Sequence, residues 1–88
     1  MPKIEYTRRF LRSYRKLSKD LQQKVSKAVA LLAENPRHPS LQTKPVRGSA
    51  GIYEARIDIN YRLTYERWPE DTLKLRAVGS HDETLKNP

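Results

Sequence analysis

The spacing of apolar residues changes once along this 88-residue chain, and that change limits the folds open to it. From the N-terminus to residue 34 the apolar residues recur every three or four positions, whereas beyond Gly51 they alternate with polar residues. The first spacing gives a helix one apolar face, and the second gives a strand one apolar face. A chain of this length makes one domain, so residues 1–88 are predicted to form a single α+β domain.

Two helices are expected in the first half, after a short strand over residues 3–6. Thr7 and Ser18 are suitable N-caps, because their hydroxyls can accept from the free N–H groups of a helix start. The second helix should end at Asn35, since the residue before a proline disfavours helical backbone. Its apolar stripe consists of Leu21, Val25, Ala28, Val29 and Leu32. We expect the helices to form an antiparallel hairpin with one face to bury.

Three consecutive strands are expected beyond Gly51, and Pro69-Glu70-Asp71 makes the turn before the last of them. Segment 35–51 is loop-like and compatible with a short strand over 44–47. The apolar sets are Tyr53, Ala55, Ile57 and Ile59, then Tyr61, Leu63 and Tyr65, then Leu73, Leu75 and Ala77. The predicted order is β-α-α-β-β-β, with the two-helix hairpin packed on one face of a small, twisted, mostly antiparallel sheet.

Positive charge is the strongest compositional feature. Lys and Arg number 18 against 10 Asp and Glu, which gives a net charge of +8. Residues 1–34 hold nine basic and three acidic side chains, so the excess lies mainly in the helical segment. On charge alone two interpretations remain open: a solvated helix surface that aids solubility, and a surface for a polyanion or an acidic partner.

Several kinds of site are not expected. The chain has no cysteine, which excludes disulfides and thiolate metal sites. His38 and His81 do not make a metal site by themselves, no Gly-rich phosphate loop is present, and no cofactor is implied. No apolar run approaches the roughly 18–20 residues of a membrane span, and the N-terminus lacks an apolar signal segment. We therefore expect a cytoplasmic protein that has no membrane partner.

The sheet face turned away from the apolar sets should be basic. It would carry Glu54, Arg56, Arg62, Thr64, Lys74 and Arg76. Four cations with one carboxylate repel one another at the roughly 5 Å spacing of neighbouring strands. A solvated face is the plain alternative, but such faces usually mix charges. The pattern therefore favours an anion-binding face.

His81, which follows the last strand, is the candidate for proton transfer. In RNA the 2′-hydroxyl can attack the adjacent phosphate, which requires a base, an acid and cations that stabilise the phosphate. Arg62 and Arg56 suit the last role, because guanidinium matches phosphate oxygens with a bidentate fork. The alternative for His81 is a loop residue that caps the tail through Asp82 and Glu83. His38 is interpreted as a turn residue.

The chain resembles the RelE/ParE toxin superfamily over nearly its whole length. Four stretches carry the resemblance, and their order and spacing are as in the family. They are Tyr6-Thr7-Arg8-Arg9-Phe10 with Tyr14-Arg15-Lys16-Leu17, then Lys44–Gly48 with Gly51–Arg56, then Tyr61–Glu66, and finally Val78-Gly79-Ser80-His81-Asp82-Glu83. The last stretch is similar to the "G-x-H-[DS]" ending of one branch.

The resemblance implies a toxin that is neutralised by a co-expressed, acidic antitoxin that folds as it binds. For RelE-like members it further implies ribosome-dependent cleavage of mRNA. Arg62 and Arg56 fall on phosphate-stabilising positions, and His81 falls on the acid or base of the histidine-bearing branch. Lys44, Arg47, Lys74 and Arg76 would bind the RNA backbone.

Two positions depart from the family pattern, and other functions stay open. Glu54 stands where RelE carries a lysine, and Leu85 stands where many active members place a tyrosine or phenylalanine that orients the substrate. A ParE-like inhibitor of DNA gyrase shares the fold and cleaves nothing. A homologue without toxicity and an ordinary RNA-binding module are the remaining alternatives.

Overall fold

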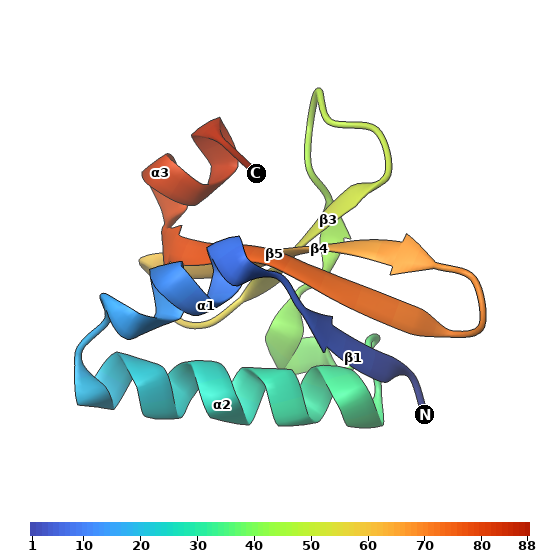
Figure 1. The fold of residues 1–88 in the computed structure, drawn as a ribbon, viewed down its shortest axis with the longest axis horizontal. Helices are drawn as coiled ribbons and strands as arrows, with labels where there is room; N and C mark the ends of the chain where they lie inside the picture. The colour runs from blue at the N-terminus through green and yellow to red at the C-terminus, as the bar shows by residue number, and fades with distance from the viewer.

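The computed structural model describes residues Met1–Pro88, which fold as helices on both sides of a five-stranded sheet (Figure 1). The elements are β1 (Lys3–Tyr6), α1 (Arg8–Arg15), α2 (Lys19–Glu34), a 3-10 turn (Pro39–Leu41), β2 (Lys44–Pro45), β3 (Ile52–Arg56), β4 (Tyr61–Trp68), β5 (Thr72–Ser80) and α3 (His81–Lys86). No helix is long and apolar enough to cross a membrane.

Both helix starts are set by the predicted caps. The Thr7 hydroxyl accepts from the Phe10 N–H at 3.0 Å, and the Ser18 hydroxyl accepts from the Leu21 N–H at 3.3 Å. The same Thr7 hydroxyl donates to the Leu75 carbonyl oxygen at 2.8 Å, which ties the start of α1 to β5. α2 ends at its cap Asn35, as the following proline requires. The predicted helices are thus confirmed.

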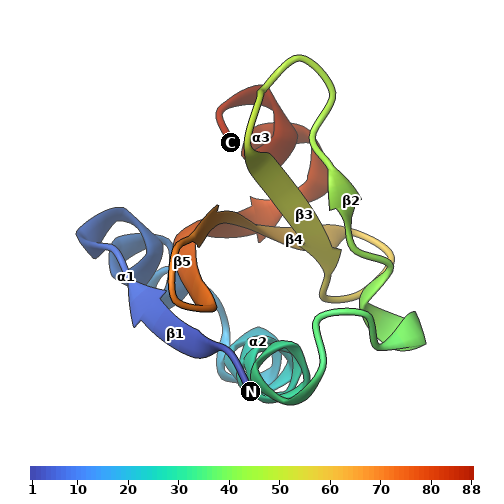
Figure 2. The same cartoon turned by 90° about the vertical axis from the view of Figure 1, so that its right-hand side faces the viewer.

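The sheet has the order β1-β5-β4-β3-β2, with β1 parallel to β5 and the other pairs antiparallel. α2 covers one face, whereas α3 and the loop between β2 and β3 stand on the opposite side (Figures 1 and 2). This arrangement confirms the predicted α+β class and helical hairpin. Strand β2 is shorter than predicted, and α3 is an element that the sequence analysis did not predict.

The hydrophobic core lies between α1, α2 and the sheet. Phe10 and Leu32 contribute large, fully buried side chains from the helices, and Tyr65 does so from the centre of the sheet. The other members of the core are Val25, Ala28, Leu41, Ala55, Leu63, Leu73, Leu75 and Val78. Tyr65 belongs to the core as the alternation predicts.

A β-bulge in β5 makes one part of the predicted pattern wrong. Thr64 pairs with Ala77 and Tyr65 pairs with Leu75, so Arg76 is an extra residue without a partner in β4. An inserted residue turns the following side chains to the other face. Val78 therefore enters the core in place of Ala77, which was predicted to face the helices.

The prediction for Ile59 is also wrong. Strand β3 ends at Arg56, and Ile59 is 73% exposed in the turn that follows. Asp58 stabilises this turn, because its Oδ1 accepts from the backbone N–H groups of Asn60 and Tyr61, both at 2.9 Å. Local hydrogen bonds from the carboxylate outweigh the apolar alternation here.

Asp58 should make the stability of the fold depend on pH. Burial acts to raise the pKa of Asp58, but hydrogen bonds from the Asn60 N–H, the Lys24 ammonium and the Tyr61 N–H outweigh it, so the pKa is lowered. A lowered carboxyl pKa stabilises the fold above the unfolded value of about 3.9, and this stability is lost as pH falls through the folded value.

We expect Asp58→Asn to lower the free energy of unfolding by about 0.5–1 kcal/mol at pH 7, where solvent screens the exposed Lys24. The difference from the unmodified protein should shrink below pH 4, once both side chains are uncharged. Urea unfolding at pH 7 and pH 3 measures both values. An equal difference at the two pH values would contradict this role of the Asp58 charge.

Candidate active site

The candidate site lies on the sheet face opposite α2. Strands β3 and β4 place Glu54 beside Thr64 and Arg56 beside Arg62 in the strand register. α3 stands over one side of this face, and the loop between β2 and β3 stands over the other (Figure 2). The sheet is therefore open to a ligand between these two segments.

Arg62 is held in one orientation at the start of β4. Its Nη1 donates to the carbonyl oxygens of Asp58, at 2.5 Å, and Tyr61, at 2.9 Å. Its Nε lies 3.7 Å from Oε1 of Glu54, and both side chains are largely buried. The Nη2 donors make no hydrogen bond within the chain. Arg62 thus offers two fixed donors of the kind that bind a phosphate oxygen.

Glu54, which is 5% exposed, gives the face a direct ion pair. The carboxylate orients Arg62 and reduces the positive charge around it. Glu66 is a second carboxylate near this face, so the predicted cluster of four cations with one carboxylate is wrong in its charge balance. Glu66 has the same strand parity as Arg62 and Thr64, and that parity was the signal in the sequence.

His81 lies at the same end of the sheet as Arg62. It is the first residue of α3, and its backbone N–H donates to the Asn60 carbonyl oxygen at 2.7 Å. Arg62 pairs with Gly79, two residues before His81. The His81 side chain is half exposed, with Nδ1 3.3 Å from Oδ1 of Asp82. A carboxylate that orients one ring nitrogen and leaves the ring accessible suits proton exchange with a substrate.

Gly79 explains why the strand can be followed by a helix that folds back over it. A Cβ atom at this position would lie 3.0 Å from the Thr84 hydroxyl oxygen, and Thr84 is buried where α3 packs. Any larger residue would push α3 away from the sheet. The glycine of the Gly-x-His stretch therefore helps to position His81. Leu85, on the same helix, is partly buried.

The other predicted residues on this side lie toward the sheet edge. The Arg56 side chain lines a hollow of about 240 Å³ together with Lys24, Lys27 and Asp58, which places it nearer α2 than Arg62 is. Lys44 is exposed on β2 opposite Glu54, and Arg47 is exposed in the loop that follows. The structure brings Arg62 and His81 to one end of the sheet and leaves Arg56 at its edge.

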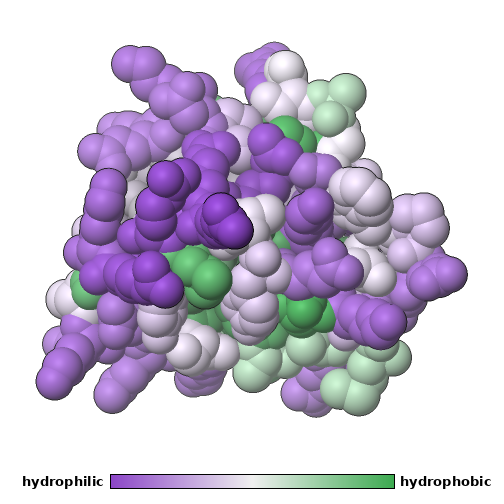
Figure 3. Space-filling model, in the orientation of Figure 1, coloured by the Kyte–Doolittle hydropathy of each residue, from purple (hydrophilic) through white to green (hydrophobic).

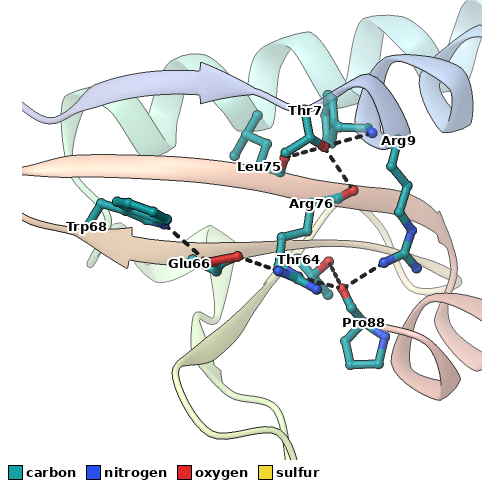
Figure 4. Close-up of polar contacts among 9 residues, drawn as sticks. Thr7, Arg9, Thr64, Glu66, Trp68, Leu75, Arg76 and Pro88 are labelled. Atoms are coloured by element: carbon teal, nitrogen blue, oxygen red, sulfur yellow. Dashed lines mark hydrogen bonds and ion pairs between the residues drawn. The ribbon is translucent and has the colours of Figure 1, made fainter.

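A second polar cluster surrounds Arg76 (Figure 4). The Arg76 guanidinium forms an ion pair with Glu66, and Glu66 accepts from the Trp68 indole N–H at 3.1 Å. Lys74 packs on Trp68, with Nζ 4.7 Å from the ring centroid. Burial acts to raise the pKa of Glu66, but hydrogen bonds from Trp68 and Arg76 outweigh it, and the pKa is lowered. Trp68, predicted to close the hairpin, instead belongs to this cluster.

The helical side carries an apolar groove. It has a volume of about 450 Å³ and is lined by ten residues, nine of them hydrophobic, including Ile4, Tyr6, Leu11, Tyr14 and Val29. In the surface view, apolar atoms gather around α1 and β1 above α2 and are surrounded by hydrophilic side chains (Figure 3). An exposed apolar groove with a polar rim is typical of a protein interaction site.

Comparisons with known proteins agree on one family. A family model described as the ParE toxin of type II toxin–antitoxin systems matches residues 4–85. A comparison with curated proteins gave no match. Among solved structures, the toxin–antitoxin complex RelBE2 from Mycobacterium tuberculosis is 27% identical, with a TM-score of 0.74 over 92% of this chain and 100% of that chain.

Two more distant structures share the fold. YafQ from Escherichia coli strain BL21(DE3) is 20% identical, with a TM-score of 0.76 over 94% of this chain and 97% of that chain. The toxin fold of the archaeal RelE–RelB complex from Pyrococcus horikoshii OT3 is 16% identical, with a TM-score of 0.73 over 90% and 93%. Because the family model spans nearly the whole sequence, the chain belongs to the ParE toxin family of type II toxin–antitoxin systems, within the RelE/ParE superfamily.

Proposed function

We propose that this toxin is an endoribonuclease that cleaves mRNA on the ribosome and so stops translation. The observation that carries the proposal is the position of Arg62, with two free and oriented donors, at the same end of the sheet as the accessible His81 ring. Phosphodiester cleavage requires a phosphate ligand and a group that moves a proton, and these two residues supply them.

The reaction follows from RNA chemistry. The 2′-oxygen attacks the adjacent phosphorus and loses its proton, while the bond from phosphorus to the 5′-oxygen breaks and that oxygen gains a proton. The products are a 2′,3′-cyclic phosphate and a 5′-hydroxyl. His81 gives or accepts one of these protons, and the Nη2 donors of Arg62 stabilise the negative charge that grows on the phosphate oxygens. Arg56 adds positive charge from the neighbouring strand.

Four further cations would hold the RNA on either side of this centre. Lys44 and Arg47 are exposed beside β3, and Lys74 and Arg76 lie on β5. Their contacts to phosphate would not depend on sequence, so they would position the strand without choosing the cleavage site.

A second function is favoured by the family match itself, since the matching model is described as the ParE toxin. A ParE-like chain would inhibit DNA gyrase and cleave nothing. The ion pair between Glu54 and Arg62, which lowers the charge at the candidate centre, is compatible with that alternative.

The apolar groove on the helical side is the proposed docking site for the antitoxin. The solved complexes of RelE with RelB, of YafQ with DinJ and of RelBE2 show toxins of this fold bound to antitoxins. The groove is apolar and the helices around it carry most of the positive charge, which fits an amphipathic acidic segment that folds as it binds.

Cleavage by purified protein tests the nuclease directly. Ribosomes stalled on a defined mRNA are incubated with the toxin, and primer extension maps new 5′ ends; the same mRNA without ribosomes serves as the control. We expect cuts within the reading frame when ribosomes are present. Intact mRNA on ribosomes, combined with inhibited supercoiling by gyrase in a parallel assay, would favour the ParE-like function.

A further inference from the structure

Three side chains from separate parts of the chain donate to a single backbone oxygen. The oxygen of Pro88 accepts from Arg9 Nη1 at 3.4 Å, Thr64 Oγ1 at 3.2 Å and Arg76 Nε at 3.0 Å (Figure 4). Arg9 also donates to the backbone oxygen of Asn87. The donors come from α1, β4 and β5, so the fold assembles them from elements that are far apart in sequence.

These donors are fixed by the fold without the help of the tail. Thr64 is fully buried in β4. Arg76 is the extra residue of the β-bulge, and its ion pair with Glu66 holds the guanidinium in place while Nε stays free to donate. Because Trp68 binds the other oxygen of Glu66, the carboxylate is itself held. Bulges commonly redirect a side chain in this way next to functional sites.

The donors exceed what a backbone oxygen needs. Two guanidinium groups and a hydroxyl converge on it, and only Glu66 balances their charge. An oxygen of a phosphodiester carries negative charge, and hydrogen bonds from guanidinium to such an oxygen are about twice as strong as those to a neutral acceptor. The arrangement therefore fits a phosphate better than it fits the tail.

The position of the donors relative to Arg62 supports the same ligand. Thr64 lies two residues after Arg62 on the same face of β4, which corresponds to about 7 Å along a strand. This distance is comparable to the length of one nucleotide in an extended single strand. A phosphate bound at Arg62 and another bound near Thr64 can thus belong to neighbouring nucleotides.

We propose that Arg9, Thr64 and Arg76 form a second phosphate-binding site, in which the tail over residues 87–88 takes the place of an RNA phosphodiester and leaves when RNA binds. The inference rests on the proposed binding of RNA to this face, but it does not require cleavage. It adds Arg9 and Thr64 to the RNA contacts and gives the tail the role of a competing ligand.

Binding of a non-cleavable RNA tests the site. A fluorescent 2′-O-methyl RNA of twelve nucleotides is titrated with each full-length variant over a series of salt concentrations, and fluorescence anisotropy gives the dissociation constant. We expect Arg76→Gln and Arg9→Gln each to weaken binding about five- to tenfold at low salt and to lower the slope against salt by about 0.7, the value for one phosphate of a single strand. Thr64→Val should weaken binding about two- to threefold.

Arg12→Gln is the matched control, because it removes the same charge from an exposed position on α1 outside the cluster. It should bind RNA like the unmodified protein. Thermal melting of every variant excludes loss of folding as the cause. Because Arg9 and Thr64 lie on different elements from Arg76, a folding defect in one variant leaves two others that decide the question.

NMR separates displacement of the tail from distant effects. In protein labelled with nitrogen-15, the Arg76 Nε–H and the Asn87 amide should shift at the same RNA concentration, since RNA replaces the tail at Arg76. RNA that binds Arg76→Gln and Arg9→Gln as tightly as the unmodified protein, with no shift of the Arg76 Nε–H, overturns the site. That result leaves the nuclease intact if mRNA is still cleaved. Binding that depends on Arg76 without any cleavage supports the site and overturns the nuclease, and RNA that does not bind the unmodified protein overturns the site.

Discussion

Replacement of Arg62 or His81 by alanine should abolish growth arrest. Loss of a phosphate ligand in the transition state typically costs about 100- to 1,000-fold in rate, and loss of a general acid or base costs about 100- to 10,000-fold. We expect reductions of this size in single-turnover cleavage of mRNA on the ribosome. Arg12→Ala, on the exposed side of α1, should keep full activity.

Arg62 also has a structural role, which the experiment must separate from catalysis. Its Nη1 holds the turn between β3 and β4 through the carbonyl oxygens of Asp58 and Tyr61. Arg62→Lys keeps the charge but loses the two-donor geometry, so it should fold and still cleave slowly. His81 makes no such backbone contact through its ring, and His81→Ala should melt close to the unmodified protein. Growth arrest that survives both alanine variants would rule out this mechanism.

Phe10→Ala should cause the largest loss of stability. Phe10 is 1% exposed and lies in the core between α1 and the sheet. Truncation of a buried phenylalanine costs about 3–5 kcal/mol, a large part of the roughly 5–15 kcal/mol that stabilises a domain. At about 4–8 °C per kcal/mol, the melting temperature should fall by more than about 12 °C. Differential scanning calorimetry measures the change.

Leu11 provides the matched control for Phe10. It is the next residue of α1, but it is 37% exposed and lines the apolar groove. Leu11→Ala should cost less than about 1 kcal/mol in the isolated toxin. A loss of stability at Leu11 as large as that at Phe10 would mean that α1 packs differently from the structure described above.

The sequence predicts those features that depend on local patterns. Thr7, Ser18 and Asn35 mark the helix ends through hydrogen bonds within a few residues, and the structure confirms all three. The alternation beyond Gly51 predicts the three strands and the core position of Tyr65 for the same reason. His38 caps the 3-10 turn and accepts from the Ser40 N–H, as expected for a turn residue.

Features that depend on distant contacts were missed. The bulge at Arg76 exchanges Ala77 for Val78 in the core, and nothing in the alternation marks it. The tail folds into α3 because Gly79 leaves room for Thr84, a contact between a strand and a helix. Arg9 meets Pro88 across 79 positions of sequence, so its place beside Arg76 follows only from the fold.

The candidate centre was predicted in its residues but only partly in its geometry. Arg62 and His81 come to one end of the sheet because β4 and β5 pair there, as the meander implies. The roles of Glu54 and Glu66 as direct partners of Arg62 and Arg76 depend on side-chain directions that the sequence does not specify.

Induction of the toxin in cells without its antitoxin, with pulse-labelling of protein and DNA synthesis in parallel, is the most direct test of the nuclease. We predict that protein synthesis falls first and that mRNA is cut within reading frames, while DNA synthesis continues at the start. A first fall in DNA synthesis, with translation continuing and mRNA intact, would contradict the proposed cleavage of mRNA and identify gyrase as the target.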